Sequence, residues 1–202
     1  MEFVGYHGRE DPDHADNIIK IWNDNRQLPP AARPDCFERA TLDSSWNGKD
    51  TFYFYFEKSD AKERAGKSGK TVRMQTVDIP YEYPQIVEFV CRDDTTKNER
   101  LFADNPSLSS HEEELIQQSM ALFDAAERMC DENLILPDGK ATAPERTCVI
   151  SNYLWDHCSE IKFMIGCYSV QNRHTQLASH SHRPRWQFAF RDNALIADVD
   201  YA

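Results

Sequence analysis

A histidine and a glycine at the end of a short apolar run are the first residues of this sequence with evident chemistry. The run Phe3-Val4-Gly5-Tyr6 leads directly into His7 and Gly8. A neutral imidazole carries one donor and one acceptor nitrogen, so His7 can hydrogen-bond a hydroxyl group at pH 7. Gly8 has no Cβ, which leaves its backbone N–H and C=O open to a group that approaches closely. Because a lone histidine is more often structural, this pair needs support from the rest of the chain.

Two tyrosines in an aromatic run are the next candidates. Residues 51–56 read Thr-Phe-Tyr-Phe-Tyr-Phe, a composition typical of a β-strand. Side chains alternate along a strand, so Tyr53 and Tyr55 are expected on the same face. A tyrosine ring can stack on a planar ligand while its hydroxyl stays in water. The competing interpretation is that these rings belong to a hydrophobic core.

Two other groupings of reactive side chains lack the spacing that their chemistry requires. His157 and Cys158 are neighbours in a predicted helix, where adjacent residues do not face each other, so a Cys–His nucleophile is not expected. A second group follows no zinc pattern and lies in a polar segment that we expect to be a solvated loop; its members are Cys167, His174, His180 and His182. The sequence therefore predicts no metal site.

The elements that position these residues follow from hydrophobic spacing. Asp11 and Pro12 are typical of a helix start, and Ser110 with Glu113 resembles a capping box ahead of the longest apolar stripe. Further helical turns are expected at residues 59–65 and 152–155. Strands are expected at residues 3–6, 51–56, 71–79, 86–91, 147–150, 161–168 and 186–190. Short strands without regular βαβ alternation indicate an α+β fold, here as a single domain over residues 1–202.

The order of these motifs resembles one known family. Residues 3–8, Phe-Val-Gly-Tyr-His-Gly, are similar to the opening strand of the diphtheria-toxin and poly-ADP-ribose-polymerase branch of ADP-ribosyltransferases. Trp46-Asn47-Gly48, the aromatic run 52–55 and a helix with Ala61 and Ala65 follow in the family's order, and residues 186–188 stand where it has its last active-site strand. The resemblance implies a split pair of small antiparallel sheets around an NAD cleft, with two or three flanking helices.

The resemblance also implies roles on NAD, which is a substrate of this family. His7 would contact a ribose hydroxyl, Gly8 the nicotinamide amide, and Tyr53 or Tyr55 the nicotinamide ring. Gln187 would orient the ribose or the acceptor. The candidate catalytic residues are thus His7, Tyr53, Tyr55 and Gln187, and the candidate NAD-binding residues are Tyr6, His7, Gly8, Arg9, Tyr53 and Tyr55.

Three positions depart from the family's pattern. Arg9 stands where the family usually has Thr or Ser, and position 64 is Arg, close to where a second tyrosine is expected. Gln187 supplies no negative charge, and Glu160 is the alternative by its approximate position. Two functions stay open: a mono-ADP-ribosyltransferase acting on a protein, nucleic-acid end or small molecule, or an inactive relative that binds NAD, ADP-ribose, a nucleic-acid end or a protein partner.

Composition excludes several other classes. The 23 basic residues against 34 acidic ones give a formal net charge of −11, so a broad basic face for duplex nucleic acid is not expected. The local group Arg183, Arg185 and Arg191 either binds a phosphate or forms a solvated edge. No apolar run is long enough to span a membrane, and the first residues lack the pattern of a signal peptide. We therefore expect a cytoplasmic protein with reduced cysteines, either an intracellular enzyme or a toxin-like effector delivered by other machinery.

Overall fold

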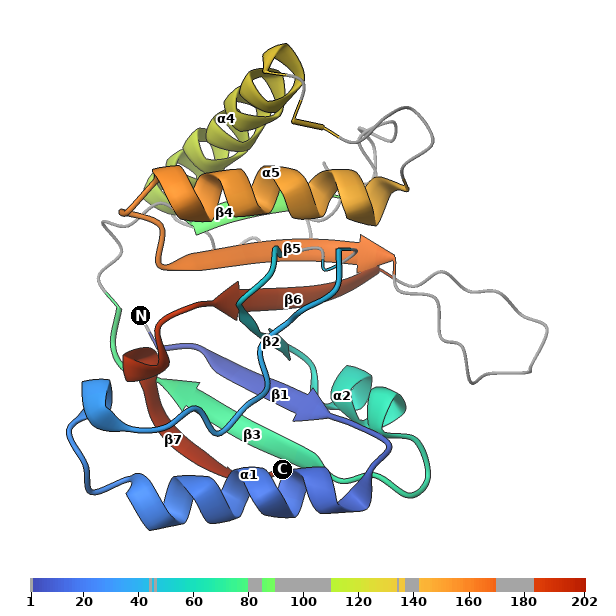
Figure 1. Ribbon diagram of the computed structural model, residues 1–202, viewed down its shortest axis with the longest axis vertical. Helices are drawn as coiled ribbons and strands as arrows, with labels where there is room; N and C mark the ends of the chain where they lie inside the picture. Colours follow the sequence, from blue (N-terminus) through green and yellow to red (C-terminus); the bar gives the residue numbers. More distant parts are fainter. Residues whose placement is uncertain are drawn as a thin grey trace. The chain divides into compact units, whose positions relative to one another are not determined.

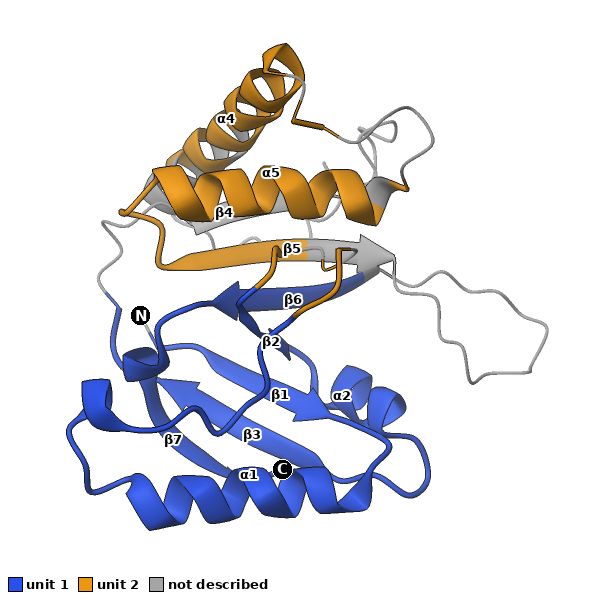
Figure 2. Ribbon diagram, in the orientation of Figure 1, with its two compact units in different colours: residues 1–40, 50–82, 169–202 blue, residues 41–49, 83–168 orange. Residues whose placement is uncertain are grey.

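The structure is a computed structural model that describes residues 2–43, 45, 47–79, 85–89, 110–133, 135–136, 142–169 and 184–202. The chain divides into two compact units (Figure 2). Unit 1 comprises residues 1–40, 50–82 and 169–202, and unit 2 comprises residues 41–49 and 83–168. The strands and helices confirm the predicted α+β class.

Unit 1 contains a five-stranded antiparallel sheet in the order β6-β2-β1-β3-β7 (Figure 1). Its strands are β1 (Val4–Gly8), β2 (Phe52–Tyr55), β3 (Thr71–Thr76), β6 (Pro184–Phe190) and β7 (Ile196–Tyr201). Its helices are α1 (Pro12–Asn25) and α2 (Lys58–Ala65), with short 3₁₀ turns at Pro30–Ala32 and Asn193–Leu195. The elements that carry the predicted site therefore all lie in unit 1.

An aromatic layer fills one face of this sheet. Phe54 stands opposite Phe188 and Phe52 opposite Phe190 on neighbouring strands, and all four side chains are fully buried. The rings of Phe54 and Phe190 stack with centroids 5.5 Å apart. Burial of a phenylalanine side chain contributes roughly 2–3 kcal/mol, so this layer is a main source of stability in unit 1. The competing interpretation of the aromatic run as core is correct for Phe52, Phe54 and Tyr55, whereas Tyr53 and Phe56 are half-buried.

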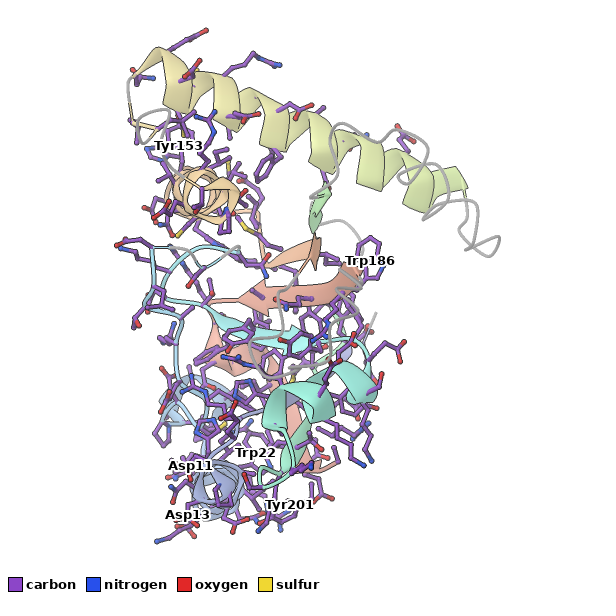
Figure 3. All side chains as sticks on the ribbon, turned by 90° about the vertical axis from the view of Figure 1, so that its right-hand side faces the viewer. Asp11, Asp13, Trp22, Tyr153, Trp186 and Tyr201 are labelled. Atoms are coloured by element: carbon purple, nitrogen blue, oxygen red, sulfur yellow. The ribbon has the colours of Figure 1, made fainter. Side chains whose placement is uncertain are left out.

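Helix α1 begins as the sequence predicts, and contacts of Asp16 in its N-terminal half hold it in place. The Asp11 carboxylate accepts a hydrogen bond from the Asp13 backbone N–H at 3.0 Å, and Pro12 is the first helical residue. Figure 3 labels Asp11 and Asp13 at this end of the helix. Ala15, Ile18 and Trp22 form its buried side. The Lys70 ammonium lies 2.7 Å from Asp16 Oδ1, to which the Tyr201 hydroxyl also donates at 2.7 Å. These contacts fasten α1 to β7 and to Lys70, which directly precedes β3.

Unit 2 consists of β4 (Gln85–Phe89), α4 (Ser110–Glu132), α5 (Ala143–His157) and β5 (Phe163–Ser169). β4 and β5 pair in parallel. The Trp155 indole N–H donates to the Asn47 carbonyl at 2.8 Å, which holds residues 41–49 against α5. A buried cluster forms the core of the unit and contains Phe123, Ala126, Cys130, Ile150, Leu154, Ile161 and Met164.

The structure differs from the expected elements in four respects. Residues 147–150, predicted as a strand, lie within α5, and β7 was not predicted. In place of a pair of antiparallel sheets, unit 1 holds one antiparallel sheet and the pair β4 and β5 is parallel. The described residues contain four α-helices, whereas the family resemblance implies two or three flanking helices. Trp46 and the side chains of the predicted capping box at Ser110 and Glu113 lie outside the description.

Membrane-spanning helices are also absent from the described residues, since none of their helices combines the length and the apolar character that crossing a bilayer requires.

Candidate functional site

His7 lies near the end of β1, inside unit 1 rather than on its surface. Its side chain is only 3% exposed. The ring centroid is 5.5 Å from that of Tyr53 and 5.6 Å from that of Phe37, both in edge-to-face arrangements. The structure thus brings together His7 and one of the two tyrosines that the sequence singled out.

Both ring nitrogens of His7 have a partner in the protein. Nδ1 lies 3.4 Å from the Tyr53 carbonyl oxygen, and Nε2 lies 3.1 Å from Nε2 of His14 in the first turn of α1. A carbonyl oxygen can only accept a hydrogen bond, so the proton of neutral His7 belongs on Nδ1. Its Nε2 is then an acceptor, and His14 Nε2 must be the donor. The contacts therefore assign the tautomers of both rings.

Burial keeps His7 neutral. Loss of solvation, with a further contribution from the neighbouring His14, lowers the pKa of His7 from 6.5 to about 3. The positive charges of Arg9 and Arg64 act in the same direction. Burial also lowers the pKa of His14, which is only partly enclosed. At pH 7 the His7 imidazole is a neutral group with one fixed donor and one fixed acceptor.

Gly8 is a glycine because helix α2 approaches it closely. A Cβ built at Gly8 would lie 2.2 Å from the Ala61 carbonyl oxygen and 3.1 Å from the Ala65 Cβ. No side chain fits at that separation. The two alanines noted in the sequence are therefore the small residues that let α2 contact the end of β1. This packing explains why residue 8 is a glycine without reference to a ligand.

The strand register separates the predicted residues between two faces of the sheet. Tyr6 stands opposite Tyr55, and Tyr55 stands opposite Gln187. Residues directly opposite on antiparallel strands share a face, whereas successive residues on one strand alternate. Tyr6, Tyr55 and Gln187 therefore lie on the α2 side of the sheet, and His7 belongs to the α1 side. By the same alternation the Cβ of Tyr53 is on the side of Tyr55, yet the His7 ring contacts both the ring and the backbone carbonyl of Tyr53.

The tyrosines differ in their availability to a ligand. Tyr55 is 3% exposed, and its burial raises the pKa of its hydroxyl to about 12. Its hydroxyl is therefore enclosed and does not lie at a wet rim of a pocket. Tyr53 is half-buried. Of the two candidates for stacking on a nicotinamide ring, Tyr53 is the accessible one.

A buried ion pair connects β6 to α2 beside Tyr55. Arg185 Nη2 lies 2.7 Å from Glu63 Oε2, and Arg185 Nε lies 3.8 Å from Asp60 Oδ1. The side chains of Arg185 and Asp60 are almost fully buried, whereas Glu63 is partly exposed. The sequence left two alternatives for the basic residues around Trp186, a phosphate site or a solvated edge. Arg185 fits neither alternative, because it is buried and pairs with carboxylates of α2.

The remaining predicted residues have simpler surroundings. Tyr6 is half-buried on β1, and Arg9 forms a 2.6 Å ion pair with Glu38 in a partly exposed position. Gln187 is buried on β6 at 6% exposure. Glu160 is exposed in a turn of unit 2. His174, His180, His182 and Arg183 lie outside the described residues, as does the side chain of Cys167.

Metal-binding groups of three or more His, Cys, Asp or Glu side chains do not occur within the described part of the chain. Two residues that shape the site, His14 and Asp60, are not among those predicted from the sequence. His14 follows the predicted start of α1, so its place in the first helical turn could be read from the sequence. Its contact with His7 depends on how the chain reverses between β1 and α1, for which the sequence carries no signal.

Comparisons of this chain with protein families, curated proteins and solved structures found no match.

Proposed function

We propose that unit 1 binds NAD and transfers its ADP-ribose group to an acceptor, as a mono-ADP-ribosyltransferase. The observation that carries the proposal is the proximity of His7 to Tyr53, with ring centroids 5.5 Å apart. Side chains that cooperate on one nicotinamide riboside must lie within reach of the same small group. The two residues come from segments far apart in the sequence, and they meet beside Gly8, as the family resemblance implies.

The proposed reaction breaks the bond between C1′ of the ribose and the nicotinamide nitrogen. The electron pair of that bond goes to the nicotinamide ring, which leaves as a neutral molecule, and C1′ takes on oxocarbenium character. A nucleophilic oxygen or nitrogen of the acceptor then forms a bond to C1′ and releases its proton to solvent. His7 would accept a hydrogen bond from a ribose hydroxyl, and Tyr53 would stack on the nicotinamide ring.

Gln187 sets an upper limit on the expected rate. Its carboxamide can orient a hydroxyl group but cannot place a negative charge beside the developing cation. A preorganised electrostatic group is typically worth two to three orders of magnitude in rate. Gln187 also lies on the sheet face opposite to that of His7. We therefore propose slow transfer of single ADP-ribose groups, and no polymer synthesis.

Release of nicotinamide from NAD by the purified chain tests this function. The assay needs separate arms with water, a cell lysate, and an oligonucleotide with a terminal phosphate as acceptor. Tyr53→Leu should lower the rate tenfold or more, to the order expected for a lost positioning group. Tyr153→Leu, which removes a half-buried tyrosine of α5 in unit 2, is the matched control and should leave the rate unchanged. No release in any arm would refute the enzyme.

A second candidate is a catalytically inactive module that binds NAD or ADP-ribose through the same residues. Two observations favour it: residue 187 is a glutamine, and both nitrogens of His7 are already engaged within the chain. Calorimetry with NAD and with ADP-ribose separates the candidates. Binding without nicotinamide release supports the module, whereas measurable turnover rules it out.

A further inference from the structure

The contact between His7 and His14 joins the end of β1 to the first turn of α1. The two Nε2 atoms are 3.1 Å apart, and the ring centroids are 5.3 Å apart at an angle of 40°. Each neutral imidazole has a single acceptor nitrogen. Because His7 Nδ1 donates to the Tyr53 carbonyl, Nε2 is the only acceptor that His7 offers to any other group. In the structure, His14 occupies that acceptor.

We infer that His14 occupies the position on His7 that a ribose hydroxyl takes when NAD or ADP-ribose binds, and that binding requires His14 to leave. The inference rests on the proposed function, because it assumes that His7 receives a ribose hydroxyl. One hydrogen bond to His7 Nε2 then replaces another. The exchange costs the ligand part of its affinity, since a contact within the protein must first be broken.

The surroundings of His14 allow this exchange. His14 is half-buried, whereas His7 is buried. Three charged groups near His14 act on its pKa: the guanidinium of Arg9 lowers it, and the carboxylates of Glu38 and Asp11 raise it. Because His14 is half-buried, its ring N–H can donate to water after it leaves His7. The displaced ring thus keeps a hydrogen-bond partner near the surface.

The first test is calorimetric and uses ADP-ribose with the full chain. His14→Ala removes the internal donor and leaves the His7 acceptor without its protein partner. In the free variant, the buried His7 acceptor then lacks a hydrogen bond within the protein, and a bound ribose hydroxyl would supply one. The gain corresponds to about a tenfold change in affinity. ADP-ribose should therefore bind His14→Ala about tenfold more tightly than the wild type. His14→Gln retains an N–H donor and should stay close to the wild-type Kd.

His157→Ala is the matched control. His157 also bonds a carbonyl through Nδ1, at 2.8 Å to Tyr153, but it is exposed in unit 2. This substitution should leave the Kd unchanged. Equal or weaker binding by His14→Ala, with binding by the wild type intact, would overturn the role of His14 while the proposed function stands. No binding of ADP-ribose or NAD by the wild type or by any variant would overturn both.

A second measurement needs no substitution. In the ¹⁵N-labelled wild-type chain, nuclear magnetic resonance should detect a nitrogen–nitrogen coupling across the hydrogen bond from His14 Nε2 to His7 Nε2. The coupling should disappear when ADP-ribose saturates the protein, and the His7 Nε2 resonance should stay in the range of an acceptor. A coupling that persists in the saturated complex would mean that His14 is a structural partner only, and it would refute the inference.

Discussion

At the scale of single residues, the buried neutral histidine couples stability to pH. The pKa of His7 is about 3 in the folded chain and about 6.5 when unfolded. The unfolded chain therefore binds more protons between these values, and stability falls as pH drops below 6.5. Between pH 7 and pH 5 this single group should remove about 2 kcal/mol from the free energy of unfolding. The lowered pKa of His14 acts in the same direction.

Urea unfolding at pH 7 and pH 5 checks this expectation. His7→Phe keeps a ring among Phe37, Phe54 and Tyr53 but cannot titrate, so the loss of stability between the two pH values should shrink. His157→Phe, at an exposed histidine, should retain the full wild-type loss. Identical pH dependence in the wild type and His7→Phe would mean that His7 is not held neutral by its surroundings.

Gln187 offers a test by gain of function at the same scale. The resemblance implies that β6 is the late active-site strand, but the register places Gln187 on the sheet face opposite to His7. Gln187→Glu should therefore leave NAD turnover unchanged. A rise of about tenfold or more, as expected for a negative charge beside the ribose, would show that the ribose lies on the Gln187 face and would contradict its contact with His7. Gln118→Glu, on an exposed part of α4, serves as the control for added charge. Loss of folding in Gln187→Glu would show that residue 187 is core. A tenfold fall in Glu160→Ala, with Gln187→Ala unchanged, would show that the wrong residue was chosen.

At the scale of elements, the sequence predicted those that carry their own local signals. Asp11 and Pro12 predict the start of α1, and the aromatic run at residues 51–56 predicts β2. Residues 147–150 were misread as a strand because their composition is apolar and β-branched. The decisive signal lies upstream: the Thr142 backbone N–H donates to the Glu145 carboxylate at 2.7 Å, a capping-box contact that starts α5. β7 was not predicted because two charged residues, Asp198 and Asp200, interrupt the apolar pattern that is typical of a strand.

The close approach of α2 to β1 makes Gly8 a sensitive position. Gly8→Ala places a Cβ 2.2 Å from the Ala61 carbonyl oxygen, which belongs to backbone and cannot rotate away. The helix must shift, and overpacking of this kind typically costs about 1–3 kcal/mol. Urea unfolding should show a loss in that range. Lys62→Ala, on the exposed side of α2, should change stability by less than about 0.5 kcal/mol.

Loss of Arg185, the buried cation of the ion pair between β6 and α2, should lower the free energy of unfolding more than the Gly8 substitution does. Arg185→Met removes the cation beside the buried Asp60 carboxylate, and breaking a buried pair in this way costs about 3–5 kcal/mol. Arg64→Met, an exposed arginine on α2, is the matched control and should cost less than about 1 kcal/mol. Equal effects of the two substitutions on the free energy of unfolding would contradict the assigned role of Arg185.

At the scale of the whole molecule, the fold class followed from the sequence, but the division into units did not. Alternating apolar residues and turn residues predict only the local structure of a short stretch of sequence. Unit 1, in contrast, is assembled from three segments that are separate in the sequence. The meeting of His7 with Tyr53 was expected only through the family resemblance. The contact of His7 with His14 depends on tertiary structure that no local pattern encodes. The single domain predicted for residues 1–202 stays a prediction.

The connectivity of the chain makes that prediction testable. Residues 83–168 of unit 2 join two segments of unit 1. If unit 2 unfolded alone, this stretch would become a flexible loop whose closure costs on the order of 4 kcal/mol. That cost falls on unit 1, so its stability depends on the folding of unit 2. We expect both units to lose structure over the same range of urea concentration.

Two buried cysteines report on the units separately. Cys36 lies in unit 1, where burial raises the pKa of its thiol to about 12, and Cys148 lies in unit 2, where burial also raises the thiol pKa. Both thiols should resist a short pulse of alkylating reagent in the folded chain, because the thiolate is the reactive form. Mass spectrometry of pulses across a urea series should give the same midpoint for both. Alkylation of Cys148 at clearly lower urea than Cys36 would establish that the units unfold independently.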